Sequence, residues 1–201
     1  MIRSVNIICA FGVLAILVSC SSSKEFPRAY YNENSEVLQS MKQRYKQDYN
    51  ARPFSLEITD KSFKRVGLEM ILDTIRYIYN FQIDDPSLAD TLRRYNYKAT
   101  EILGLIHDMQ EVQCTWLNNL DYYENLEKKY LVFVSIRHRK LESTWRKDKY
   151  FTLAFFDTPQ PFDDKGRLLD KKNKKQIRKI NGAVFYKVDD RTGYALTTHF
   201  R

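Results

Sequence analysis

Glycine is scarce in this chain, and its glycines stand far apart. The 201 residues include six glycines, and the closest two are Gly182 and Gly193. A loop that cradles a phosphate and the G-x-S-x-G elbow of α/β-hydrolases both need glycines at close, fixed spacing. The sequence therefore excludes the common nucleotide-binding loops and α/β-hydrolase chemistry.

Histidine and cysteine are also few, with three of each. The chain has no H-E-x-x-H motif, no C-x-x-C motif and no two histidines close in sequence, so the spacings typical of zinc sites are missing. We expect no metal and no cofactor. Low-complexity tracts and internal repeats are absent as well, and 43% hydrophobic residues suffice for a globular core.

An apolar run from Ile7 to Val18 follows Arg3 and closes with Leu17-Val18-Ser19-Cys20. The run is too short for a membrane-spanning helix and has the length of the apolar part of a signal peptide. The closing residues resemble the lipobox of bacterial lipoproteins. This resemblance implies that residues 1–19 are removed and that the sulfur of Cys20 carries a diacylglycerol, which anchors the mature chain to a membrane.

The same resemblance favours the outer membrane, because a serine follows the acylated cysteine, and it leaves open whether the protein faces the periplasm or the outside. Residues 20–34 are polar and predict a flexible tether that reaches on the order of 20 Å. Residues 35–201 have the length of one domain. The alternative is an ordinary secretory signal that is cleaved near the same place.

Cys114 is the one cysteine left in the mature chain, since Cys9 lies in the signal and Cys20 would be acylated. It therefore has no intramolecular disulfide partner. A lone thiol is usually buried as a small hydrophobe, and no flanking motif supports a catalytic nucleophile. We expect Cys114 to be buried and unpaired.

The first half of the mature chain has apolar residues at helical spacing. This spacing predicts a helix over 35–50, a central buried helix over 59–80, and a third helix that starts at Asp85-Pro86 and continues to Ile106. A short strand is predicted over 54–58. Periodicity does not decide between a continued helix and a hairpin over 109–129.

The second half predicts four strands. The first starts at Tyr130, and the other three cover residues 151–156, 183–188 and 194–200. The fold class is therefore α+β, with N-terminal helices packed on a C-terminal antiparallel sheet of about four strands. This order resembles, at the level of the fold only, the cystatin-like and related cone-shaped folds. Those folds serve as ligand pockets, inhibitors and enzymes, so the resemblance selects no role.

A strongly basic segment, residues 163–180, lies between two of the predicted strands. We expect a long solvated hairpin loop whose charge keeps it off the core, with contact to an anionic partner as the functional alternative. The segment holds three aspartates against eight cations, which are Lys165, Arg167, Lys171, Lys172, Lys174, Lys175, Arg178 and Lys179. The candidate anion-binding residues are six of these, namely Lys171, Lys172, Lys174, Lys175, Arg178 and Lys179.

Three histidines are candidates for acid–base chemistry. His107 is interpreted as a partner of a helix C-terminus. His138 and His199 could meet across the sheet near Asp157 or Glu142, and a histidine with a carboxylate in a cleft permits general base catalysis. Histidines at strand ends are more often solvent-facing polar residues.

Together these features predict a cell-envelope lipoprotein that acts as a non-catalytic binding module at the membrane surface. The expected partner is a protein or another anionic envelope component, and the compartment makes nucleic acid a poor partner in spite of a pI near 9.3. The alternatives are an envelope hydrolase or transferase with a His/Asp site on the sheet, and an inhibitor or immunity lipoprotein.

Overall fold

The computed structural model describes residues 26–124, 127–137 and 150–197, and the chain divides into two compact units after Ser35. In the first unit, residues 26–33 are helical, although the sequence predicts a flexible tether there. Within it, the Phe26 and Tyr30 rings lie 6.0 Å apart. Cys20 lies outside the described residues.

The second unit is an α+β domain with one large antiparallel sheet. Its helices are α2 (Ser35–Ala51), α3 (Pro86–Arg94) and α4 (Ala99–Glu111). Its strands are β1 (Phe54–Ile58), β2 (Arg65–Leu72), β3 (Ile75–Gln82), β4 (Cys114–Glu124), β5 (Glu127–Arg137), β6 (Tyr150–Phe156), β7 (Lys179–Ile180), β8 (Ala183–Val184), β9 (Tyr186–Lys187) and β10 (Thr192–Thr197).

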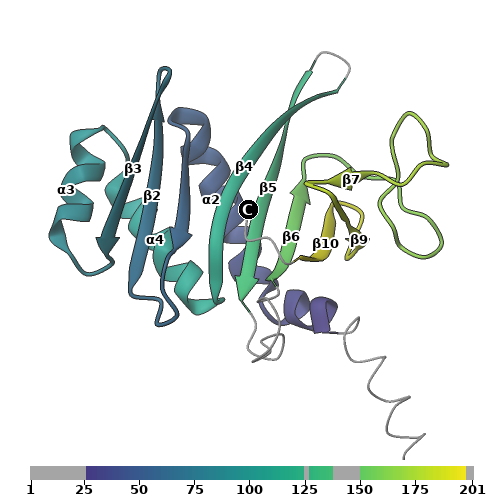
Figure 1. Cartoon of the computed structure of the whole chain (residues 1–201), viewed down its shortest axis with the longest axis horizontal. Coiled ribbons are helices and arrows are strands. Elements are labelled where there is room, and N and C mark those ends of the chain that lie inside the picture. Colours follow the sequence, from purple (N-terminus) through teal and green to yellow (C-terminus); the bar gives the residue numbers. More distant parts are fainter. Residues whose placement is uncertain (1–25, 125–126, 138–149, 198–201) are drawn as a thin grey trace, which may run out of the picture. The chain divides into compact units, whose positions relative to one another are not determined.

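Within the described residues, eight strands form the sheet in the order β3-β2-β1-β4-β5-β6-β10-β9, and β7 and β8 form a separate hairpin. Figure 1 shows β3 at one end of the sheet and β9 at the other. Every neighbouring pair is antiparallel. The predicted α+β class is confirmed, but the prediction of about four strands is wrong.

Helix α2 packs on one face of the sheet through large side chains. Leu38, Met41 and Tyr45 are fully buried at three- and four-residue spacing. The Tyr45 hydroxyl donates to the Phe54 carbonyl oxygen at 2.7 Å, and the two rings meet edge-on with centroids 5.0 Å apart. Tyr45 thus fixes α2 against β1, and the predicted helix and following strand are confirmed.

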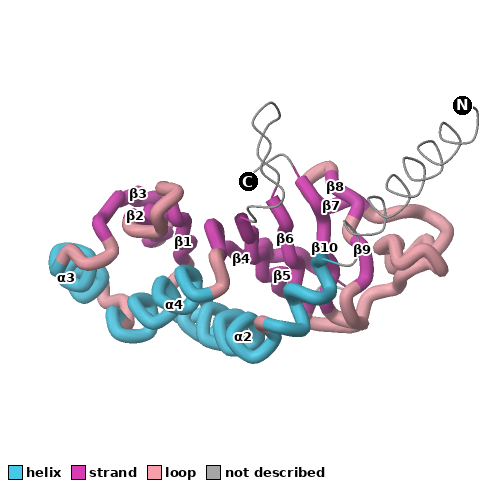
Figure 2. The backbone as a smooth tube through the Cα atoms, turned by 90° about the horizontal axis from the view of Figure 1, so that it is seen from below, coloured by secondary structure: helices cyan, strands magenta, loops and turns pink. Residues whose placement is uncertain are grey.

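The main core lies between the helices and this face of the sheet. Side chains in a strand alternate between two faces, so every second residue contributes. The register places Phe54 opposite Met70 and Leu56 opposite Leu68. The same buried face continues across the central strands through Leu117, Val132, Val134, Leu153 and Phe155. Figure 2 shows α2, α3 and α4 along this one side of the sheet.

Residues 59–80 form a hairpin, so the predicted central helix is wrong. β2 and β3 pair around the two-residue turn Asp73-Thr74, in which Asp73 has a φ of 55°. The predicted apolar stripe runs over both strands, with Met70 on β2 and Ile78 on β3. Two alternating strands joined by a short turn can reproduce helical spacing by coincidence.

The third predicted helix begins where the sequence indicates and then breaks. The Asp85 carboxylate accepts from the Ser87 N–H at 2.8 Å and caps α3. Asn96 takes a left-handed φ of 59°, which separates α3 from α4. Tyr97 then turns inward and donates to the Pro53 carbonyl oxygen at 2.9 Å, and burial raises the pKa of Tyr97 to about 12.

The undecided residues 109–129 contain the end of α4 and the strand β4, which forms a long hairpin with β5. The strands predicted from Tyr130 and over 151–156 correspond to β5 and β6. The strand predicted over 183–188 is split, because β8 pairs with β7 whereas β9 pairs with β10. The described part of the strand predicted over 194–200 belongs to β10.

A second core covers the other face of the sheet in its C-terminal half. Trp116 and Phe133 stack there with centroids 6.2 Å apart. They pack with Leu168, Ile180 and Phe185, which come from the connection between β6 and β10. Figure 2 shows β7 and β8 on the side of the sheet opposite the helices. This half of the sheet is therefore covered on both faces.

Candidate interaction surface

The basic segment, residues 163–180, is a packed layer over the second core. Leu168 is fully buried and Ile180 is 6% exposed. The Leu168 N–H donates to the Phe185 carbonyl oxygen at 2.8 Å, and the Leu168 carbonyl oxygen accepts from the Arg178 N–H at 2.9 Å. The prediction of a hairpin loop whose charge keeps it off the core is therefore wrong, because the apolar residues of this segment anchor it to the sheet.

Two aspartates build the turns of the basic segment. Asp163 accepts from the Arg167 N–H at 2.7 Å and from the Arg167 Nε at 2.7 Å. Asp170 accepts from the backbone N–H groups of Lys172 and Asn173, both at 2.8 Å. These backbone bonds hold the pKa of both carboxyl groups below its usual range. The aspartates are thus committed to the backbone and to Arg167.

The cations of the segment fall into two groups. Three have polar partners: Arg167 pairs with Asp163, the Lys171 Nζ donates to the Thr158 Oγ1 at 2.8 Å, and an Arg178 Nη1 donates to the Gln160 Oε1 at 3.3 Å. The others are exposed, namely Lys165, Lys172, Lys174, Lys175 and Lys179. The exposed lysines define what we call the lysine surface.

The lysine surface can attract an anion without a large reorganisation. Apolar packing and backbone hydrogen bonds hold the segment below it, so the mean position of the charges is fixed while each ammonium group stays hydrated. Clustered charges of one sign raise the local concentration of oppositely charged ligands and accelerate their association. Of the candidate anion-binding residues, Lys171 and Arg178 also have the partners above, and the remaining four belong to this surface.

Asp157, the candidate catalytic carboxylate, serves to hold α2 on the sheet. Its Oδ1 accepts from the Lys46 Nζ at 2.5 Å, and its Oδ2 accepts from the Tyr130 N–H at 3.0 Å. Lys42 lies nearby over the Phe155 ring, and burial lowers the pKa of Lys42. The partner histidines predicted for Asp157, His138 and His199, lie outside the described residues, as does Glu142.

His107 lies on α4 with Asp108 and Glu111, and ligand atoms of the three lie within 4.8 Å of one another. Asp108 already forms an ion pair with Arg44 of α2. The guanidinium group of Arg44 lies close to Gly104, in space that a larger side chain would need. A cation at this position would have to displace the arginine, and the other two groups are exposed. We therefore assign the cluster to helix packing.

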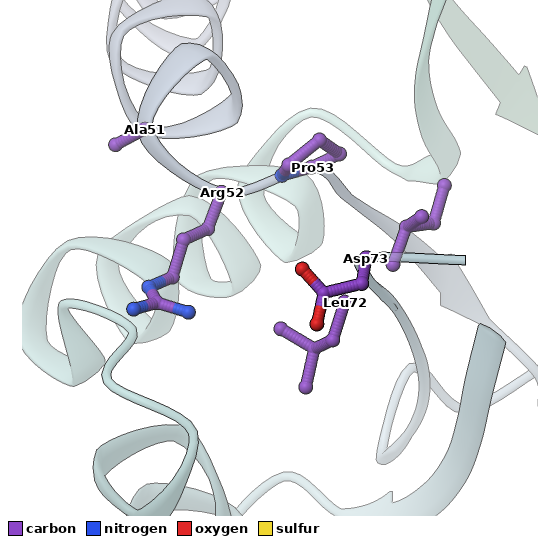
Figure 3. A pocket seen from close by; sticks show the side chains of 6 residues that line it. Ala51, Arg52, Pro53, Leu72 and Asp73 are labelled. Carbon is purple, nitrogen blue, oxygen red and sulfur yellow. The ribbon is translucent and has the colours of Figure 1, made fainter. Parts of the chain in front are cut away.

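A hollow of about 460 Å³ lies between the end of α2 and the β2–β3 turn. Figure 3 shows the guanidinium group of Arg52 and the carboxylate of Asp73 facing it from two sides, with Leu72 next to the aspartate. Its lining is Ala51, Arg52, Pro53, Ile71, Leu72 and Asp73. The lining contains neither a nucleophilic hydroxyl or thiol group nor a histidine, which acyl transfer needs. Its one carboxylate is that of Asp73, so it also lacks the pair of carboxylates that glycosyl transfer needs.

Cys114 is buried and free, as predicted. Its thiol donates to the Trp116 carbonyl oxygen at 3.3 Å, and burial raises its pKa to about 12. Because the thiolate is the reactive form, we expect iodoacetamide to label native Cys114 at pH 8 at least tenfold more slowly than in the unfolded chain. Mass spectrometry after timed quenching measures the two rates. Equal rates would identify an accessible, reactive cysteine.

Comparisons with protein-family models, with curated proteins and with solved structures found no match to this chain. Among the described residues, none of the helices has both the length and the apolar character needed to cross a bilayer.

Proposed function

We propose that this protein is a lipid-anchored, non-catalytic interaction module of the cell envelope, which binds an anionic partner through its lysine surface. Cys20 is the proposed site of acylation, and the outer membrane is the proposed location. The observation that carries the binding role is the construction of the basic segment. Leu168 and Ile180 are buried in the second core while five lysines remain exposed.

The charge balance supports an anionic partner. The chain has a formal net charge of +8, and the basic segment concentrates cations on one connection. Two of its three aspartates bind backbone N–H groups of the segment itself. An acidic protein is the leading partner, and phosphate groups of envelope lipids are the other available anions.

The enzyme alternative gains no support from the described residues. Both oxygens of Asp157 already accept hydrogen bonds, one from a lysine of α2 and one from the backbone of β5. Catalysis by a base needs a nucleophile, a base and groups that stabilise charge in one place.

At the level of the fold only, we also propose a likeness to cystatin-like folds, supported by the long helix α2 packed on an antiparallel sheet.

The proposal predicts that binding depends on the exposed lysines whereas folding does not. Replacing Lys172, Lys174, Lys175 and Lys179 with Gln should change the free energy of unfolding by less than about 0.5 kcal/mol, because all four are exposed. The same variant should bind vesicles with anionic lipid, or an acidic protein captured by crosslinking in cells, several-fold more weakly. Binding by the wild type should also weaken as salt shortens the Debye length below about 10 Å.

A matched pair of variants separates local from total charge. Lys174→Gln with Lys175→Gln removes two cations from the lysine surface, and Lys61→Gln with Lys64→Gln removes two exposed cations from the β1–β2 turn. Only the first pair should weaken binding. Equal losses would show that net charge alone matters, and salt-insensitive binding by all variants would refute the proposal.

A further inference from the structure

The edge strand β3 is long and has little of the protection that isolated sheet edges usually have. It spans eight residues at the end of the sheet order, and within the described residues it pairs with β2 alone. Monomeric proteins blunt such edges with lysines, prolines, bulges or very short strands. β3 has no lysine, no proline and no register shift against β2. Its single charge, Arg76, is paired with Glu69.

Two of the most exposed large apolar side chains of the described residues lie on this strand. Ile75 is 55% exposed and Ile78 is 62% exposed. On the helix side, Tyr77 and Tyr79 lie near Tyr95, and the hydroxyl groups of Tyr79 and Tyr95 are 2.8 Å apart. An added strand would therefore find apolar and aromatic side chains along β3.

The backbone direction shows which groups of β3 face outward. The Ile83 N–H donates to the Lys64 carbonyl oxygen at 2.9 Å, on the β2 side. Because N–H and C=O groups alternate along a strand, the odd-numbered residues of β3 face β2 and the even-numbered residues face the open edge. Arg76, Ile78 and Asn80 therefore present their backbone groups outward.

We propose that β3 pairs with β3 of a second copy of this chain, antiparallel and centred on Ile78, so that one sheet continues through both copies. This register places Ile78 opposite Ile78 of the partner, Tyr77 opposite Tyr79, and Ile75 opposite Phe81. It covers both exposed isoleucines. It also places Arg76 opposite Asn80, so like charges do not meet across the interface.

A shift of the centre to Tyr79 fits less well. That register would need the Gln82 carbonyl oxygen for pairing, but this oxygen already accepts from the Asp85 N–H at 3.1 Å. It would also leave Ile75 outside the paired region. The interface is isologous, the type that closes a dimer and leaves no further β3 edge open. It does not depend on the lysine surface, so the failure of one proposal leaves the other standing.

Disulfide crosslinking tests the pairing and its register in the full chain. In the proposed register the two Ile78 Cα atoms lie about 5.5 Å apart, within disulfide range. In the same register Asn80 lies opposite Arg76 of the second copy, so the two Asn80 residues are offset by four residues, roughly 13 Å along the strand. With a mild oxidant in intact cells, Ile78→Cys should give a dimer band on a non-reducing gel. Asn80→Cys and the wild type should give little or none.

A second measurement uses the non-covalent dimer. Light scattering on the detergent-extracted protein at micromolar concentration should give a dimer mass for the wild type and a monomer mass for Ile78→Lys. Leu120→Lys is the matched control, since Leu120 is 42% exposed on β4, away from this edge, and it should stay dimeric. A monomeric wild type, or equal crosslinking of Ile78→Cys and Asn80→Cys, would overturn the proposal.

Discussion

Replacing Leu168 with Ala is expected to lower the free energy of unfolding by about 2–5 kcal/mol, a large effect for a residue inside a charged segment. Leu168 is fully buried in the second core beside Phe185. Removing most of its side chain leaves a cavity in that core, because the rigid strands below cannot close around it. Urea unfolding followed by circular dichroism measures the loss.

The same variant should also loosen the basic segment. The backbone of Leu168 links Phe185 to Arg178 through two hydrogen bonds, so poorer packing at this position should open both turns of the segment. Limited trypsin digestion should then cut faster at its lysines. Leu120→Ala is the matched control, because Leu120 is 42% exposed, and it should cost well under 1 kcal/mol. Equal effects of the two changes would mean that the segment does not pack on the sheet.

The basic segment shows what a charge pattern can and cannot predict. Its composition correctly indicates exposed lysines, since single charged side chains are rarely buried. The same composition hides Leu168 and Ile180, which lie in a mostly polar segment and form no strand or helix period. Their burial depends on Trp116 and Phe133, which belong to the distant β4–β5 hairpin. Contacts of that kind are set by tertiary structure and leave no local signal.

The β2–β3 hairpin was predictable in principle, although the helical spacing concealed it. Val66, Leu68 and Met70 alternate with the less apolar Gly67 and Glu69, and the residues from Ile75 to Phe81 are mostly aromatic or β-branched. Both features are typical of strands. The turn between them contains no glycine, and Asp73 takes the left-handed conformation instead. Without a glycine the turn gives little signal, so a helix pattern that spans it looks continuous.

The start of α3 was predicted, whereas its end was not. The cap at Asp85 depends on an aspartate and the proline after it, both of which act within one turn. The break at Asn96 depends on Tyr97, whose hydroxyl reaches the carbonyl oxygen of Pro53, the residue before β1. The residues considered for function show the same difference between local chemistry and tertiary contacts. Cys114 was placed correctly from its chemistry, whereas the hydrogen bonds of Asp157 to α2 and β5 come from the fold.

Cys20→Ala is expected to abolish lipid anchoring, which is the largest effect on location that any single substitution should have. Two or three acyl chains give stable membrane attachment, since each buried methylene contributes about 0.8 kcal/mol. Without the sulfur, no diacylglycerol can be attached at residue 20. The wild type should therefore incorporate labelled palmitate and sediment with membranes. The variant should take up no label, and it should be found either soluble or with residues 1–19 still attached.

Cys9→Ala is the matched control for this experiment, because it removes a cysteine from the segment that precedes the lipobox-like residues. It should be labelled and fractionate like the wild type. If Cys20→Ala still incorporated palmitate, or if the wild type were soluble and unlabelled, the lipoprotein proposal would fail. The lysine surface and the β3 edge would then act in a protein that is free to diffuse, and pairing through β3 would need a higher protein concentration, since attachment to a membrane would no longer concentrate the copies.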